Sequence, residues 1–124
     1  MADEQFEKLE KIVYDNDLEA FKQEFENGTD VNLQNRYGWT PLHIAIRRDR
    51  REMVTYLLDK GADMDKVDGV GWTPLMEAVM DDMPELCELL IERGADVTIV
   101  NERGGTAALL VKKFGRSSME KYFQ

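Results

Sequence analysis

His43 and Cys87 carry the most reactive side chains in this sequence, and each is the sole member of its residue type. Nucleophilic catalysis needs a nucleophile with an adjacent base, and zinc sites need several imidazole or thiolate ligands. One histidine and one cysteine leave no residue to spare for either arrangement. We therefore expect no catalytic residues, and we interpret Cys87 as a buried, inert thiol.

Two short patterns resemble ligand sites without meeting their requirements. The acidic segment 63–69 is similar to a calcium loop, but its third carboxylate, Asp68, comes one place late, and Pro74 stands where a bidentate Glu is needed. Pro74 also occupies the third glycine position of a dinucleotide fingerprint that begins at residues 69–71. We expect neither a metal ion nor a cofactor.

The charge and length of the chain exclude several function classes. Its 124 residues favour one domain, 43% of them are apolar, and the net charge of −9 disfavours nucleic acid and anionic lipid as partners. A single cysteine suits a reducing compartment, and no apolar run is long enough for a membrane span. Because the first residues are acidic rather than typical of a secretory signal, we expect a cytoplasmic protein.

A period of 33 residues organises the sequence. The pentapeptide at 38–42, Gly-Trp-Thr-Pro-Leu, recurs at 71–75, and Gly-Ala-Asp at 61–63 recurs at 94–96. A weaker copy of the first marker, at 104–108, keeps the glycine and threonine but loses the proline and leucine. Such decay is expected in a terminal repeat.

Each repeat carries the pattern of two helices. The first follows a Thr-Pro pair, where threonine can cap the free amides and proline suits the first turn. The second has an apolar stripe, as at 53–58, and ends at a glycine that suits a left-handed stop, as at Gly61. Between the helices the equivalent residues all tolerate positive φ and predict one shared turn; they are Asn16, Asp49, Asp82 and Gly115.

These features resemble the ankyrin repeat, whose signature Thr-Pro-Leu-His-x-Ala stands here at residues 40–45. The resemblance implies an all-α ankyrin-repeat solenoid of about four helix-turn-helix units with short hairpin fingers. We expect a single domain, 1–124, with units at about 1–32 (the N-terminal cap), 33–65, 66–98 and 99–124 (the C-terminal cap). The resemblance also explains His43 as a structural imidazole that bridges its own turn and the adjacent loop.

In similar proteins the fingers and the exposed sides of the first helices form a concave groove that holds a partner. Eighteen positions of this sequence map onto that groove. They include five cations and two anions, so the groove carries +3 and the rest of the chain −12. The residues that we select as partner-binding are Arg36, Tyr37, Trp39, Arg47, Arg48, Val70, Trp72, Met80, Arg103 and Phe114.

Tryptophan, tyrosine and arginine are the residue types that dominate binding hot spots, and Trp39 and Trp72 have no evident role in the scaffold. An alternative is that these two rings pack on each other across neighbouring fingers. The four arginines of segment 47–51 likewise fit either a solvated turn, partly neutralised by nearby carboxylates, or partner recognition.

The sequence therefore predicts a non-enzymatic interaction module, of the scaffold or adaptor kind, which is monomeric when unbound. Its partner is another protein with an acidic or aromatic patch that docks in the concave groove. The alternative is an acidic inhibitor or immunity-type protein that uses its own convex face to neutralise a basic partner. Glu85, Glu88 and Glu92 would carry the negative charge of that face.

Overall fold

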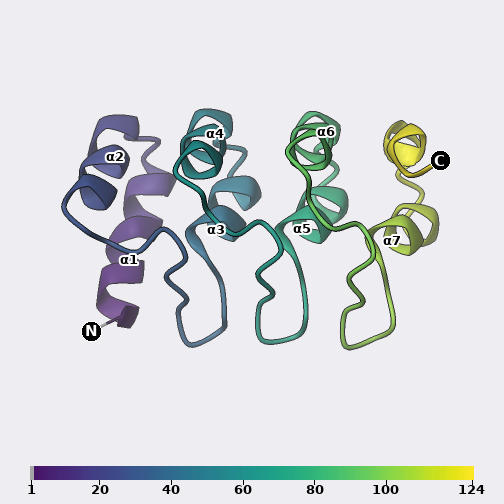
Figure 1. Cartoon of the computed structure of the whole chain (residues 1–124), viewed down its shortest axis with the longest axis horizontal. Coiled ribbons are helices and arrows are strands. Elements are labelled where there is room, and N and C mark those ends of the chain that lie inside the picture. Colours follow the sequence, from purple (N-terminus) through teal and green to yellow (C-terminus); the bar gives the residue numbers. More distant parts are fainter. Residues whose placement is uncertain (1) are drawn as a thin grey trace.

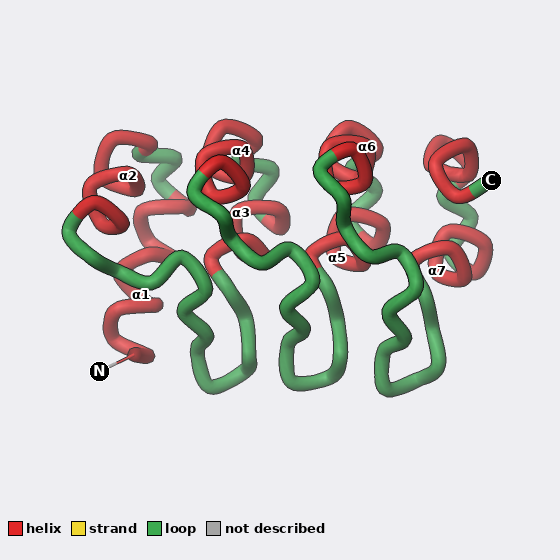
Figure 2. The backbone as a smooth tube through the Cα atoms, in the orientation of Figure 1, coloured by secondary structure: helices red, strands yellow, loops and turns green. Residues whose placement is uncertain are grey.

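The computed structural model describes residues 2–124 as a single row of helix pairs (Figure 1). Within this range the structure contains helices and loops and no β-strand (Figure 2). The elements in chain order are α1 (Ala2–Tyr14), α2 (Leu18–Glu26), α3 (Pro41–Arg47), α4 (Arg51–Asp59), α5 (Pro74–Met80), α6 (Pro84–Glu92), α7 (Ala107–Lys113) and the 3-10 helix η1 (Ser117–Phe123). The prediction of an all-α repeat solenoid is confirmed.

The first helix of each repeat begins where the threonine requires it. The hydroxyl oxygens of Thr40, Thr73 and Thr106 accept the backbone N–H three residues further on, and Pro41 and Pro74 occupy the first turn. A side chain that accepts one of the free amides stabilises a helix start by about 1 kcal/mol. Because α3, α5 and α7 have only seven residues each, such caps and tertiary packing must supply much of their stability.

The turn between the two helices of each pair uses a left-handed residue. Asn16, Asp49 and Asp82 have φ of 55°, 56° and 56°, and Gly115 has φ of 65°. Asn and Asp tolerate this region better than other residues with a Cβ, so one geometry serves all four pairs. The prediction of a shared turn at these positions is confirmed.

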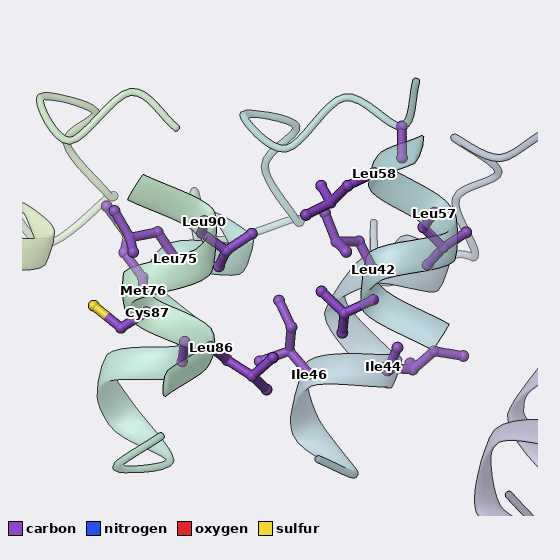
Figure 3. Packing of buried hydrophobic residues seen from close by; sticks show 14 of the residues in the cluster. Leu42, Ile44, Ile46, Leu57, Leu58, Leu75, Met76, Leu86, Cys87 and Leu90 are labelled. Carbon is purple, nitrogen blue, oxygen red and sulfur yellow. The ribbon is translucent and has the colours of Figure 1, made fainter. Parts of the chain in front are cut away.

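One apolar core runs along the row. Leu42, Ile46 and Leu57 of the second pair and Leu75 and Leu90 of the third are all nearly or fully buried (Figure 3). First helices pack on first helices, and the outer helices α4 and α6 cover them from the other side. Each pair therefore depends on its neighbours to bury its apolar surface.

The last pair departs from the pattern. Its second element, η1, is a 3-10 helix that starts without a side-chain cap, after Arg116. It nevertheless closes the row, because Met119 is fully buried and η1 packs on both α6 and α7.

The fingers are tight loops held by one repeated side-chain contact. The side-chain oxygens of Asn35, Asp68 and Asn101 each accept two backbone N–H groups of their own finger, at 2.9–3.0 Å. Neighbouring fingers are joined by the backbone, since the N–H of Gly69 donates to the carbonyl of Tyr37 at 2.9 Å. Asp68, which resembled a calcium ligand in the sequence, is thus a structural element of the second finger.

Within residues 2–124 no finger precedes the first one, and α1 lies in that place. The carboxylate of Asp3 accepts the backbone N–H of Arg36 at 2.9 Å, which is the amide equivalent to that of Gly69 one repeat later. With 13 residues, α1 is longer than the other first helices and runs alongside the finger (Figure 1). The longer α1 therefore supplies a polar acceptor to the first finger.

Candidate functional site

The ten predicted partner-binding residues lie in two sets of positions. Six belong to the three fingers, and four lie at the C-terminal ends of α3, α5 and α7. Because the fingers all project to the same side of the helix row (Figure 2), the repeat presents these positions in series. Eight of the ten form two clusters, which we call the first-finger cluster (Arg36, Tyr37, Trp39 and Arg47) and the end hollow (which includes Val70, Trp72, Arg103 and Phe114).

The first-finger cluster is a stack in which two aromatic rings lie between two guanidinium groups. The rings of Tyr37 and Trp39 lie 5.0 Å apart between centroids, with Arg36 over Tyr37 at 5.2 Å and Arg47 over Trp39 at 4.4 Å. Each such cation–π contact contributes about 0.5–1 kcal/mol when exposed. The stack holds two large aromatic surfaces in fixed orientations before any partner arrives.

Arg47 is already paired within the chain. Its guanidinium donates to the Glu77 carboxylate at 2.8 Å, and that carboxylate is itself mostly buried. Glu77 lies outside the set of groove positions on which the charge of +3 was counted, so the count overstates the positive charge available to a partner. Sequence spacing alone does not show that α5 brings this residue against the end of α3.

A second carboxyl group adjoins this pair. Loss of solvent around Asp81, together with a hydrogen bond and charge repulsion from Glu77, raises the pKa of Asp81 to about 7, although part of the side chain reaches the surface. The charged form of Asp81 is therefore disfavoured beside Glu77.

The end hollow lies between the second and third fingers and α7. It has a volume of about 790 Å³, and its apolar lining includes Trp72, Leu109 and Phe114. Charged side chains at its edge are Glu102, Arg103, Lys112 and Lys113. An apolar surface with a few charged groups at its rim is the usual composition of a binding pocket.

The two tryptophans are half-buried and pack against the core, so the expectation that they lack a scaffold role is wrong. The alternative of a stacked pair is not what the structure shows either, since the ring of Trp39 lies on Tyr37. Trp72 instead lines the end hollow, and its carbonyl joins the preceding repeat. Both rings keep a partly exposed face.

The arginines of segment 47–51 do not form one patch. Arg50 donates to the carbonyls of Val13 and Tyr14 at 2.8 Å each and so caps the C-terminus of α1. Arg51 pairs with Asp49 at 3.2 Å and with Glu85 of α6. Arg48 lies over the exposed ring of Tyr14, at 5.0 Å.

The cap made by Arg50 recurs two repeats later. Arg116 donates to the carbonyls of Val79 and Met80, at 3.2 and 2.7 Å, at the C-terminus of α5. Charge-assisted donors at this end of a helix satisfy carbonyls that have no partner inside it. Met80, the remaining predicted partner-binding residue, therefore has a structural carbonyl as well as a half-buried side chain.

His43 is fully buried and holds two repeats together. Its Nδ1 accepts the backbone N–H of Thr40 at 3.1 Å, and its Nε2 donates to the carbonyl of Trp72 at 2.9 Å. Both ring nitrogens are used, which confirms the prediction of a bridge between its own turn and the adjacent loop. The equivalent residue one repeat later, Met76, is buried without such polar contacts.

Acid should weaken the fold through His43. Burial lowers the pKa of this imidazole below its usual value near 6.5, so the folded state keeps it neutral while the unfolded state takes up a proton. As pH falls below about 6.5, the stability due to neutral His43 is therefore lost, at up to about 1.4 kcal/mol per pH unit. The free energies of unfolding of wild type and His43→Gln can be measured in urea at pH 7.5 and 5.5. We expect the difference between the two proteins to shrink as pH falls. A difference that is the same at both pH values would contradict this assignment.

The remaining reactive groups are accounted for by the scaffold. Cys87 is fully buried, as predicted, and burial raises the pKa of its thiol to about 12. The carboxylate of Asp63 accepts the backbone N–H of Asp65, and that of Asp65 accepts the backbone N–H of Asp96. Within residues 2–124 there is no group of three or more potential metal ligands, and no helix is long and apolar enough to cross a membrane.

Three exposed side chains were missed by the sequence interpretation. Tyr14 underlies Arg48, and Leu109 and Lys112 line the end hollow. Leu109 occupies the register position of His43 and Met76, both buried, and its 53% exposure reflects the lack of a following finger within the described chain. The repeat spacing alone could have indicated that Leu109 is exposed.

Sequence comparison agrees with the architecture. Residues 9–101 match the family model of ankyrin repeats in three copies. Over 52 residues the chain is 40% identical to the Notch-regulated ankyrin repeat-containing proteins of Danio rerio and of Homo sapiens, which covers 42% of this chain and 46% of those proteins. It is also 41% identical over 56 residues to ankyrin repeat domain-containing protein 40 of Mus musculus, or 44% of this chain and 15% of that protein.

The chain thus spans less than half the length of these relatives. The match to the family model covers most of the chain. The structure shows the matching features: the signature at residues 40–45, the capped first helices and the linked fingers. Ankyrin repeats generally serve as protein–protein interaction modules. This chain belongs to the ankyrin-repeat family.

Proposed function

We propose that this protein is a non-catalytic binder of another protein, which it holds against the fingers and the adjacent ends of α3, α5 and α7. The observation that carries the proposal is the first-finger cluster, because it presents two partly exposed aromatic rings between two guanidinium groups. Pre-ordered aromatic and arginine side chains lose little entropy when they bind, which favours affinity. A segment with an acidic or aromatic patch suits this surface.

Arg36 is the cation of this cluster that is best placed to meet a carboxylate. It is exposed at the tip of the first finger, and it contacts Tyr37, whereas Arg47 is engaged by Glu77. A pair between Arg36 and a partner carboxylate would lie at the rim of the interface. Such pairs mainly accelerate association and set its salt dependence.

A second candidate function uses the opposite, acidic surface to neutralise a basic partner. The first 32 residues carry ten anions and three cations, which gives that end of the row a strongly negative field. The convex carboxylates named in the sequence analysis are less free, since Glu85 pairs with Arg51 and Glu88 accepts a hydrogen bond from Tyr122 at 3.2 Å. We therefore favour the groove.

The groove proposal predicts which variants lose their partners. Three immobilised baits are compared: wild type, a groove variant (Trp39→Ala plus Trp72→Ala) and a convex variant (Glu85→Lys plus Glu88→Lys plus Glu92→Lys). Each bait is incubated with an extract of the source cells, and the captured proteins are quantified by mass spectrometry. We expect a protein that wild type and the convex variant retain and the groove variant loses. Circular dichroism of each bait confirms equal helical content, and capture that depends on the convex carboxylates instead would support the second candidate.

A further inference from the structure

We infer that the end hollow is a separate docking site for an acidic segment of a partner protein that carries a bulky apolar side chain. The inference rests on the proposed function, because it names the chemistry of a partner at the last repeat. It extends beyond the first-finger cluster, from which the hollow is separated by the second finger. Three features of the hollow carry it.

The first feature is an apolar surface that earlier repeats cover. His43 and Met76 are 0% and 1% exposed, and the finger that follows His43 contacts it directly. Leu109, in the same register, is 53% exposed beside Phe114, which is 41% exposed. Together with Trp72 they line a hollow large enough for several side chains.

The second feature is an available backbone acceptor. The carbonyls of Tyr37 and Val70 accept the N–H groups of Gly69 and Glu102, at 2.9 and 3.2 Å. Arg103 is the next residue in this register, and within residues 2–124 its carbonyl accepts no equivalent bond. A chain lying along the third finger could therefore donate a backbone N–H there, as each finger does to the one before it.

The third feature is the charge at this end of the molecule. Residues 99–124 contain five cations and two anions, whereas the chain as a whole carries −9. Two of these cations, Lys112 and Lys113, line the hollow together with Arg103, against the single anion Glu102. Basic groups around an apolar surface select an acidic segment and disfavour a basic one.

A random peptide library displayed on phage and selected on the immobilised full chain tests the assignment. We expect the enriched peptides to combine bulky apolar with acidic side chains. Their affinities, measured by fluorescence anisotropy with synthetic copies, should fall at least about tenfold for Leu109→Ala and for Lys112→Glu. Matched controls are Val100→Ala, at a residue that is 57% exposed outside the hollow, and Lys121→Glu, which makes the same charge change in the same repeat; both should stay within about twofold.

Several results would overturn the inference. Enrichment of basic or purely apolar peptides, or of none, contradicts the proposed chemistry. Peptides that tolerate Leu109→Ala but lose affinity with Trp39→Ala place the site at the first-finger cluster, so the groove proposal survives and the end hollow does not. Concentration-dependent self-association in sedimentation velocity, abolished by Leu109→Ala, would make a second copy of the chain the occupant.

Discussion

Replacing Gly38 by alanine should cost about 3 kcal/mol or more of folding stability, at least about twice the effect of the same change at Gly61. Both glycines have left-handed backbones, with φ of 80° and 82°. A Cβ at Gly38 would also lie 2.6 Å from the backbone nitrogen of Gly69 and 2.9 Å from the carbonyl carbon of Asp68, whereas a Cβ at Gly61 meets nothing within 4 Å. The second finger must move to admit it.

Urea unfolding followed by circular dichroism measures the difference. Gly61→Ala is the matched control, because it carries the same φ penalty of about 1–2 kcal/mol without the collision. Gly38→Ala should lower the unfolding midpoint far more than Gly61→Ala does. Equal losses at the two sites would show that the close approach of the fingers is not a constraint on this fold.

Removing residues 101–124 should abolish the cooperative fold. The truncation deletes α7, which packs on α5, and η1, whose buried Met119 closes the core beside α6. Leu86 and Leu90, at 1% and 0% exposure, belong to the core that α7 and η1 cover from this end. Since a repeat is stabilised by its neighbours, loss of one end exposes apolar surface and promotes aggregation.

Size-exclusion chromatography and circular dichroism on the 1–100 fragment check this expectation. We expect aggregates, or a chain with reduced helix content and a broad thermal transition. A soluble, fully helical fragment with the melting temperature of the whole chain would mean that the last pair is not needed as a cap.

The sequence was sufficient for the parts of the fold that depend on local chemistry. Thr40 and Pro41 specify a helix start, Asp49 specifies a left-handed turn, and a 33-residue period places both in every repeat. The role of His43 also followed from its place in the signature, because a buried imidazole must satisfy both of its nitrogens.

The arrangement of charges could not be obtained in this way. Glu77 meets Arg47 only because α5 packs on α3, and Arg50 caps α1 across the same kind of boundary. Such contacts join residues about 30 to 37 positions apart, and several side chains within reach compete for each arginine. Packing of the helices determines which carboxylate or carbonyl each arginine contacts, so a count of charges along the sequence overstated the positive charge available in the groove.

The central claim, that the fingers and first helices hold a protein partner, is tested most directly by the dissociation constant of a captured partner. Surface-based kinetics at two salt concentrations compare wild type with the groove variant (Trp39→Ala plus Trp72→Ala) and the convex variant (Glu85→Lys plus Glu88→Lys plus Glu92→Lys). The groove variant should lose about 2 kcal/mol or more of binding free energy, about 30-fold in affinity, while the convex variant stays within about threefold. Unchanged binding by the groove variant, with loss in the convex variant, would contradict the account.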